Sequence, residues 1–307
     1  MKREGVLVIG SANMDLVISV EKFPQPGETI FGKKFEMFPG GKGANQAVCC
    51  AKLGAKTFFL GRMGNDDFGK SLSKNMKKEG VDIHHLLIDE NENTGTALIT
   101  VEGKGENEIV VISGSNMNLS PDDVESKKEI FKEVKVVITQ LEIPIFTILE
   151  AARIAKQNGN IFILNPAPGL ELSEKLLSLV DYLTPNETEL ELLSGISVKD
   201  EKSIEMAAEE LLNKGVKNVI VTMGEKGAYL LSKERKEIFP AKKIKVVDST
   251  GAGDAFNGAI AYALSNGEEI GKAIQLANSV AAFAVTKMGA QSSLPRLEDL
   301  ELYKLAN

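Results

Sequence analysis

The sequence predicts an α/β protein in which a mainly parallel central sheet is covered by helices on both faces. Short apolar runs rich in β-branched residues are bounded by turn residues at 6–9, 57–60, 136–139, 161–164 and 219–222. Longer segments with helical periodicity separate these runs. Apolar runs that alternate with helices are typical of parallel strands buried on both faces.

The segments between the runs end as helices usually end. The predicted helices cover residues 44–53, 69–79, 144–158 and 203–214, and they are followed by Gly54, Gly80, Gly159 and Gly215. Glycine is common just after a helix because it adopts the left-handed backbone conformation at little cost. The strand and helix order therefore extends over most of the chain.

Two segments, residues 14–38 and 95–113, contain turn residues and short apolar stretches but no helical pattern. We expect strands joined by turns at residues 24–27 and 103–105, in a small antiparallel sheet that projects from the core as a lid. Because the sequence has no linker, low-complexity tract or repeat, the lid is an insertion in one domain of residues 1–307.

The predicted lid strands, at 17–18, 29–31 and 97–101, carry apolar residues that so small an insertion cannot bury within itself. We therefore expect two lids to pack together in a homodimer.

Composition excludes several classes of protein. The 307 residues include 36 Lys and Arg against 43 Asp and Glu, a net charge of −7, so no broad basic field favours nucleic acid as a partner. The first apolar run, Val6–Ile9, is too short for a signal peptide or a membrane span, so a cytoplasmic protein without a membrane partner is expected. Cys49 and Cys50 are adjacent and cannot form an ordinary disulfide, which favours a reducing compartment.

Residues 248–254 read Asp-Ser-Thr-Gly-Ala-Gly-Asp and precede a long apolar helix. Gly251 and Gly253 allow a ligand to approach the backbone, and the first N–H groups of a helix form an anion site. Asp254 lies in the same first turn, where it is either a general base beside the anion site or a carboxylate that stabilises the helix dipole. In both cases we expect the dipole to lower its pKa, and we expect the side chain to be open to solvent.

Residues 39–47 read Pro-Gly-Gly-Lys-Gly-Ala-Asn-Gln-Ala, again with glycines leading into a helix. Backbone amides, Lys42 and Asn45 could bind the hydroxyls of a polyol. Asn13 and Asp15 follow the first strand, where side chains at the carboxyl end of a parallel strand face a ligand crevice. Taken alone, each of these segments is more often an ordinary turn or cap.

Residues 64–71, Gly-Asn-Asp-Asp-Phe-Gly-Lys-Ser, match the P-loop pattern of nucleotide-binding proteins. Electrostatic repulsion argues against a P-loop, because Asp66 and Asp67 would place carboxylates in the loop that binds the polyphosphate. The sequence also has no apolar strand ending in the Mg²⁺-binding Asp that a P-loop fold needs. We interpret the segment as a turn near the sugar.

Together these motifs resemble those of the PfkB family of carbohydrate kinases, over essentially the whole chain. The matches occur in the family's order at residues 40–45, 165–168, 186–189 (Asn-Glu-Thr-Glu, the family's Asn-x-x-Glu) and 248–254. The resemblance implies a ribokinase-like fold and an enzyme that transfers the γ-phosphoryl group of ATP to a sugar hydroxyl. Lys42 in the first motif is more similar to the branch that acts on D-ribose than to the adenosine or fructose branches.

The resemblance also implies a role for individual residues. The sugar would be held by Asn13, Asp15, Gly40, Gly41, Lys42, Asn45 and Glu142. Asp254 would accept the proton of the primary (5-) hydroxyl, and the amides of Gly251, Ala252 and Gly253 would face the transferring phosphoryl group. Glu189, with Asn186, would organise Mg²⁺ and phosphate through water. Further nucleotide contacts would come from Thr222, Gly224, Gly227, Gly253 and Asn278.

Members of the family are often activated by K⁺, and the matching positions here are Asp248, Thr250, Ala284, Lys287, Gly289 and Ser293. Carboxylate and carbonyl oxygens suit a hard cation, and Lys287 could contribute only its backbone oxygen. Ser292 stands where the relatives would have proline, which is a departure from the family's pattern in this loop.

Three alternatives remain open at this point. The closest is a kinase for another small acceptor, such as fructose, 2-keto-3-deoxygluconate or a nucleoside, because polyol-binding residues differ little between such substrates. A sugar-binding regulator without turnover is disfavoured because both the base and the anion site are intact. A dinucleotide-binding oxidoreductase is disfavoured because Gly10-Ser11-Ala12-Asn13 follows the first strand in place of Gly-x-Gly-x-x-Gly.

Overall fold

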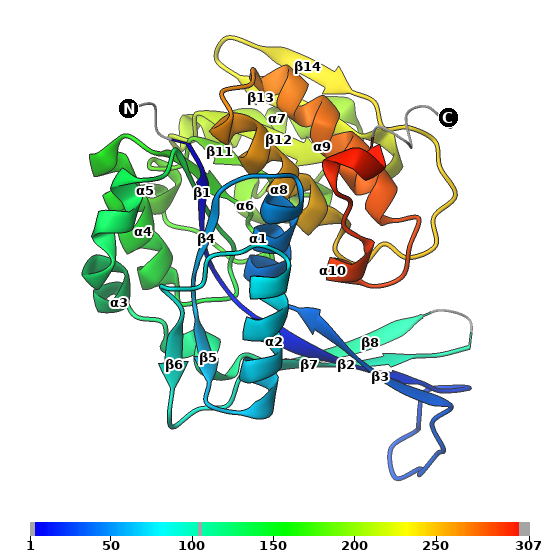
Figure 1. Ribbon diagram of the computed structural model, residues 1–307. Helices are drawn as coiled ribbons and strands as arrows, with labels where there is room; N and C mark the ends of the chain where they lie inside the picture. Colours follow the sequence, from blue (N-terminus) through cyan, green and yellow to red (C-terminus); the bar gives the residue numbers. More distant parts are fainter. Residues whose placement is uncertain (1–3, 104–105, 301–307) are drawn as a thin grey trace.

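In the computed structural model, which describes residues 4–103 and 106–300, the central sheet has the strand order β14-β13-β12-β11-β10-β9-β1-β4 (Figure 1). The strands from β4 to β12 are parallel, while β13 and β14 form an antiparallel edge. Their bounds are β1 Val6–Ile9, β4 Thr57–Leu60, β9 Val136–Thr139, β10 Ile161–Leu164, β11 Tyr182–Leu183, β12 Asn218–Thr222, β13 Ala228–Ser232 and β14 Lys236–Phe239. The predicted fold class is confirmed.

Helices cover both faces of this sheet. They are α1 Lys42–Lys52, α2 Asp67–Lys78, α3 Pro121–Ser126, α4 Ile145–Asn158, α5 Glu174–Leu177, α6 Glu187–Ser194, α7 Glu201–Asn213, α8 Ala252–Ser265, α9 Ile270–Ala284 and α10 Ala290–Ser293. Short 3₁₀ turns occupy Gly114–Asn118, Lys128–Lys132 and Gly224–Lys226. The four predicted helices are confirmed within a few residues, and the glycines that end them all have positive φ. In the described part of the chain no helix is long and apolar enough to cross a membrane.

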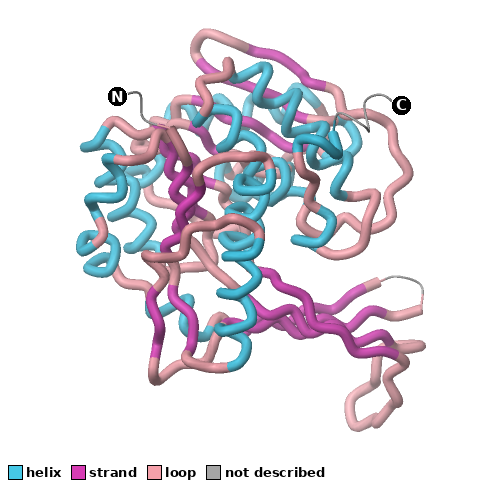
Figure 2. The backbone as a smooth tube through the Cα atoms, viewed as in Figure 1, coloured by secondary structure: helices cyan, strands magenta, loops and turns pink. Residues whose placement is uncertain are grey.

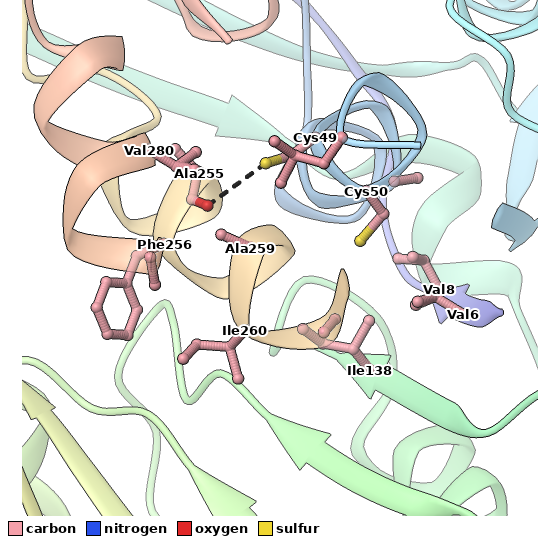
Figure 3. Close-up of a cluster of buried hydrophobic side chains, with 14 of the residues drawn as sticks. Val6, Val8, Cys49, Cys50, Ile138, Ala255, Phe256, Ala259, Ile260 and Val280 are labelled. Carbon is pink, nitrogen blue, oxygen red and sulfur yellow. Dashed lines mark hydrogen bonds between the residues drawn. The ribbon is translucent and has the colours of Figure 1, made fainter. Parts of the chain in front are cut away.

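The core divides into two layers because alternate residues of each strand face opposite sides of the sheet. In β1, Val6 and Val8 belong to the layer that contains α1, α8 and α9, whereas Leu7 and Ile9 belong to the layer that contains α4 and α7. Cys49 and Cys50 belong to the first layer. The Cys49 thiol donates to the carbonyl oxygen of Ala255 (Figure 3), and the Cys50 thiol donates to that of Gly258. Both cysteines are free, as expected, and burial raises their pKa. They are packing residues between α1 and α8.

The lid is a separate sheet that projects from the core (Figure 1, Figure 2). Its strand order is β3-β2-β7-β8, with bounds β2 Asn13–Ser19, β3 Lys34–Gly40, β7 Gly95–Val101 and β8 Asn107–Ile112. A further pair, β5 Arg62–Gly64 and β6 Leu87–Asp89, lies beside α2.

Two expectations about the lid were wrong. The sheet is mixed and not antiparallel, because β2 and β7 both run outward from the core and pair in parallel. Residues 29–31 do not form a strand: Ser19 pairs with Lys34, and the intervening residues, with Pro24 and Pro26, form a loop. Proline lacks the N–H group that a strand ladder needs. The predicted turn at Lys104 and Gly105 lies outside the described residues.

Candidate active site

Two helices begin side by side at the carboxyl edge of the sheet, and each begins at a glycine. Helix α1 follows Gly41, whose φ is 85°, and α8 follows Gly251, whose φ is 75°. Only glycine adopts such backbone angles readily. A Cβ on Gly41 would also lie 2.6 Å from the backbone nitrogen of Asn13. Neither N-cap glycine offers a side-chain cap. At α1 the first N–H groups are nevertheless engaged within the protein, because those of Lys42, Gly43 and Ala44 donate to Glu142 Oε2, Ser11 Oγ and the Ser11 carbonyl oxygen. At α8 the Ala252 N–H donates to the Ser249 carbonyl oxygen, while no bond within the described residues engages the Gly253 N–H, which can therefore bind a ligand.

Asp254 projects from the first turn of α8 and is held by side chains of α1. Its Oδ2 accepts a hydrogen bond from Asn45 Nδ2 at 2.8 Å, and its Oδ1 accepts one from Gln46 Nε2 at 3.0 Å. The side chain is buried, which corrects the expectation that it is open to solvent. Burial raises its pKa, and Lys42 and the two amide hydrogen bonds oppose only part of that rise. The expected lowering by the helix dipole is therefore wrong, because desolvation of the carboxylate is the larger effect.

Five titratable side chains lie close together here. The pKa of Asp15 is raised to about 7, by burial first and then by the nearby carboxylates of Glu142 and Asp254, against the effect of Lys42. Burial alone would lower the pKa of Lys42, but these carboxylates and Glu189 raise it. Lys42 therefore remains an ammonium ion among acidic neighbours, as a group that neutralises phosphate needs to be.

Hydrogen bonds and close contacts fix the residues that are expected to hold the sugar. Glu142 Oε2 accepts hydrogen bonds from Ser11 Oγ at 2.5 Å and from the backbone nitrogen of Lys42 at 3.0 Å. Asn13 Oδ1 accepts one from Asn116 Nδ2 at 2.7 Å. Gly40 lies beside Asp15 on the neighbouring strand, and a Cβ there would be 2.5 Å from Asp15 Cγ. The seven residues expected to hold the sugar are thus brought to one place, from β2, β3, α1 and the turn after β9.

A cavity of about 240 Å³ extends from Lys42 to the start of α8, and Lys42 is the one member of these seven residues that lines it. Its lining includes Lys42, Asn165, Thr184, Asn186, Glu189, Thr222, Gly251, Ala252, Gly253, Asp254 and Asn257. The proposed base, the helix amides and the Asn-x-x-Glu segment therefore face the same space. That arrangement suits phosphoryl transfer. In this reaction the attacking and leaving oxygens lie in line through the phosphorus, and N–H groups stabilise the negative charge of the transferred group.

Glu189 is oriented by its own helix terminus. Asn186 Oδ1 accepts from the Glu189 backbone nitrogen at 2.8 Å, and Glu189 Oε2 accepts from the Asn186 backbone nitrogen at 2.9 Å. This capping box engages one carboxylate oxygen, while Glu189 lines the cavity. A single carboxylate with room for water fits Mg²⁺, which keeps several of its waters.

Comparison with known proteins agrees with this geometry. The family model for pfkB family carbohydrate kinases matches residues 3–297. The chain belongs to the PfkB family of carbohydrate kinases. It is therefore a phosphotransferase with an alcohol acceptor, from a family whose kinases use a divalent metal with ATP.

Several members of the PfkB family are similar over nearly full length. A ribokinase of Haemophilus influenzae is 43% identical over 305 residues, 99% of this chain and 100% of the relative. The crystal structure of a Thermotoga maritima ribokinase is 41% identical with a TM-score of 0.91, covering 99% of this chain and 100% of that one. An Arabidopsis thaliana ribokinase structure with ribose and ATP is 33% identical with a TM-score of 0.93, covering 98% of each chain.

Three positions that the PfkB resemblance assigns to the nucleotide do not line the cavity. Gly224 and Gly227 lie in the turn between β12 and β13, and Asn278 lies on α9. Gly227 and Asn278 meet at the carbonyl oxygen of Phe239, which accepts from Asn278 Nδ2 at 2.9 Å and lies directly against Gly227. Thr222, at the end of β12, does line the cavity.

The positions that match the PfkB potassium site lie on the loop before α8 and on the segment from the last residue of α9 through α10, and a hydrogen bond joins the two segments. Asp248 accepts from the backbone nitrogens of Thr250, at 2.9 Å, and Gly289, at 2.8 Å. Partial burial would raise the pKa of Asp248, but these hydrogen bonds outweigh it and lower the pKa. The Lys287 ammonium lies 4.3 Å from the centre of the Phe283 ring, so Lys287 offers the loop its carbonyl oxygen only. An ionised carboxylate with carbonyl oxygens fits a hard monovalent cation.

The P-loop match has an ordinary structural explanation. Asp66 caps helix α2 by accepting from the backbone nitrogen of Gly69 at 2.7 Å, and it also accepts from the backbone nitrogen and hydroxyl of Thr94, both at 2.7 Å. The carboxylate thus occupies the helix terminus where a phosphate would bind. Lys70 is exposed and lies 3.9 Å from Asp67.

We therefore expect Lys70→Ala to leave kcat within about threefold of wild type, because an exposed surface lysine contributes little. Steady-state phosphorylation rates with ATP would check this. A loss on the order of a thousandfold, with the circular dichroism spectrum unchanged, would instead revive a phosphate-binding role for the segment.

Sequence reasoning assigned no role to several polar residues that hold the site together. They are Ser11, Gln46, Asn116, Gln140, Asn165 and Gln291, all of them buried. Gln46 and Asn165 lie inside two of the sequence motifs. Their position beside apolar helix and strand residues was a signal that these polar side chains are buried. Ser11, Asn116 and Gln291 come from separate segments, and only the fold brings them to the same place.

Proposed function

We propose that this enzyme phosphorylates the 5-hydroxyl of D-ribose with ATP. The observation that carries the proposal is the Asp254 carboxylate, held by two amides beside the N–H groups that open α8, in the cavity that Lys42 and Glu189 also line. Ribose as the acceptor is supported by the ribokinases similar over nearly full length, one of which has ribose and ATP in its structure.

In this mechanism the sugar is bound by the carboxylates and amides from β2, β3, α1 and the turn after β9. The 5-oxygen attacks the γ-phosphorus, its proton passes to Asp254, and the bond between the γ-phosphorus and the oxygen of the departing ADP breaks. The amides of Gly251, Ala252 and Gly253 stabilise the negative charge on the transferring group. Bound Mg²⁺, held through water by Glu189, would neutralise phosphate charge.

A coupled ADP-release assay with ribose, deoxyribose, fructose, 2-keto-3-deoxygluconate and adenosine tests the proposal. We expect the highest kcat/KM with ribose. A higher value with another acceptor would assign the enzyme to that substrate, and ribose binding without ADP formation would indicate a regulator. The adjacent free cysteines and the use of ATP support a cytoplasmic enzyme. The family match over residues 3–297 supports one domain of residues 1–307.

K⁺ is proposed as the activating ion at the loops of Asp248 and Gly289, because fixed oxygens select a cation by size. These loops adjoin the start of α8, so a bound ion would fix the direction of its amides. At equal ionic strength we expect a higher kcat in KCl than in NaCl. Equal rates in the two salts would remove the ion from the mechanism.

The lid supports the proposed homodimer. Its exposed side chains include Phe35, Met37, Ile109, Val110 and Val111, each at least half exposed in the single chain. Burying apolar surface of this extent favours association with a second lid. Sedimentation at micromolar concentration is expected to give a dimer, and Val111→Lys is expected to shift it toward monomer. A wild-type protein that sediments only as monomer would reject the dimer.

A further inference from the structure

A chain of three amide side chains connects Asp254 to the far side of α1. Asn45 Nδ2 donates to Asp254 Oδ2 at 2.8 Å, Gln291 Nε2 donates to Asn45 Oδ1 at 3.0 Å, and Asn75 Nδ2 donates to Gln291 Oε1 at 2.7 Å. The four residues come from α8, α1, α10 and α2. No motif singled out Gln291 or Asn75.

The carboxylate determines the direction of every hydrogen bond in this chain. An ionised Asp254 can only accept, so Asn45 must turn its NH₂ group toward it and its oxygen toward Gln291. Gln291 must then present its own NH₂ group to Asn45 and its oxygen to Asn75. The same constraint acts in reverse: Asn75, as a donor, keeps Gln291 and Asn45 in the orientation that donates to Asp254.

Burial makes that orientation costly to reverse. Asn45 is 6% exposed and Gln291 is 5% exposed, so a reversed amide would leave donors and acceptors unpaired away from water. The backbone of Gln291 is fixed as well, because Lys52 Nζ donates to its carbonyl oxygen at 2.9 Å and to that of Leu294 at 3.1 Å.

The other carboxylate oxygen is held from the opposite direction. Gln46 Nε2 donates to Asp254 Oδ1 at 3.0 Å, and Gln46 Oε1 accepts from Gln140 Nε2 at 2.6 Å. With one amide on each oxygen, the plane of the carboxylate is defined. A lone pair is then left for the acceptor hydroxyl in a fixed direction.

We propose that Gln291 and Asn75 are positioning residues, which hold Asp254 in the orientation and ionised state needed to accept the proton by fixing the amide of Asn45. The inference rests on the proposed function of Asp254. It adds that a residue on α2, outside the substrate cavity, controls the base. Asn75 and Gln291 line a separate hollow of about 100 Å³ with Phe38, Glu79 and Ser292, so the outer end of the chain can be altered without touching the cavity.

Paired substitutions at Asn75 test the direction of the chain. Asn75→Asp replaces the donor with an acceptor of similar size, so Gln291 must reverse to donate to it, which turns the Asn45 oxygen toward Asp254 or breaks the chain. Asn75→Ala only removes the outermost bond. We expect Asn75→Asp to lower kcat about tenfold and Asn75→Ala less than threefold, with ATP KM unchanged in both.

Gln291→Glu tests the central link and is expected to lower kcat by ~10–10²-fold, because its carboxylate cannot donate to Asn45. Ser292→Ala is the matched control. Ser292 is the next residue in the same segment, is exposed, and donates only to the carbonyl oxygen of Met288 at 2.8 Å. The Ser292→Ala substitution should leave kcat unchanged. The K⁺ concentration for half-maximal activity is measured in each variant. An unchanged value means that the lower kcat does not come from damage to the neighbouring loop of Gly289.

The pH dependence of single-turnover transfer provides a readout that a purely structural role would not move. Loss of a hydrogen bond to the ionised form raises the pKa of Asp254, so the acid limb of the profile should move to higher pH in Asn75→Asp and Gln291→Glu. The charged groups that face Asp254, namely Lys42, Glu142 and Asp15, are unchanged in all variants.

The wild-type enzyme is measured first, with the acceptor that it phosphorylates fastest. Failure to use ribose would refute the proposed substrate and leave this comparison intact. The inference is overturned if Gln291→Glu and Asn75→Asp stay within twofold of wild type in kcat with an unmoved acid limb. It is also overturned if Asn75→Ala is as damaging as Asn75→Asp. If Gln291→Glu does not fold, the Asn75 pair alone decides.

Discussion

Replacing Asp254 with asparagine is expected to lower kcat by about 10²–10⁴-fold, the usual contribution of a general base. The substituted side chain keeps its size and can still contact the acceptor hydroxyl, but it cannot take the proton. Sugar and ATP affinities should change much less than kcat, because the other binding groups remain.

The surroundings of Asp254 add a second expected effect. Both carboxylate oxygens accept from N–H donors, Asn45 Nδ2 and Gln46 Nε2. An amide at position 254 presents its own NH₂ group to one of these donors, so one hydrogen bond is lost in a buried place. We therefore expect a lower Tm as well. Glu142→Gln, which changes a neighbouring carboxylate to an amide, serves in the Tm measurement as the control for loss of negative charge.

Single-turnover phosphoryl transfer, together with ribose binding by calorimetry, separates the two effects. The pKa of Asp254 is raised by burial above its unfolded value. The stability linked to this proton is therefore present below the unfolded pKa, near 4, and is lost as pH rises through the folded pKa. The activity of the wild type should increase over the same rise in pH, because the base must be ionised. The pH profile of Asp254→Asn should lack this increase. Transfer at a wild-type rate in Asp254→Asn would refute the general-base assignment.

The sequence allowed the fold class to be predicted because its signals are local. The run Val6–Ile9 and the glycine after α4, Gly159, each follow from a few adjacent residues. The mixed pairing in the lid was not predictable in the same way. That β2 lies parallel to β7 depends on the path of the chain through β4, β5, α2 and β6 between them, and a strand pattern does not specify its partner.

The same distinction holds at the site. The glycines before α1 and α8 and the side chains of Lys42 and Asp254 were predictable, because each belongs to a short motif. The pKa of Asp254 was not, since it depends on α1 covering a carboxylate that, by sequence alone, lies at an open helix terminus. Gln291, 246 residues from Asn45, has no local feature that connects it to the base.

The position of Asp15, the proposed sugar-binding carboxylate, depends on the absence of a side chain at Gly40. Gly40→Ala is expected to raise the KM for the sugar by ~10–10²-fold. Asp15 and Gly40 lie on the paired strands β2 and β3, and a Cβ at position 40 would be 2.5 Å from Asp15 Cγ. The φ of Gly40 is not positive, so alanine is compatible with the backbone, and the three atoms nearest to the new Cβ all belong to the Asp15 carboxylate, which must move. Loss of one or two hydrogen bonds to a charged group accounts for the magnitude.

The control is Gly32→Ala in the same lid, where φ is also not positive and the new Cβ would meet only Ile18 Cγ2 at 3.3 Å and the Ser19 carbonyl oxygen at 3.7 Å. It should leave the sugar KM within about twofold, as most surface substitutions do.

Both variants are best compared at pH 8, because the pKa of Asp15 is raised to about 7 and the carboxylate must be ionised to accept from a hydroxyl. With Asp15 displaced, sugar affinity should fall while ATP KM stays constant. An unchanged sugar KM in Gly40→Ala would mean that Asp15 does not bind the sugar, and that the carboxylate of Glu142 carries that contact.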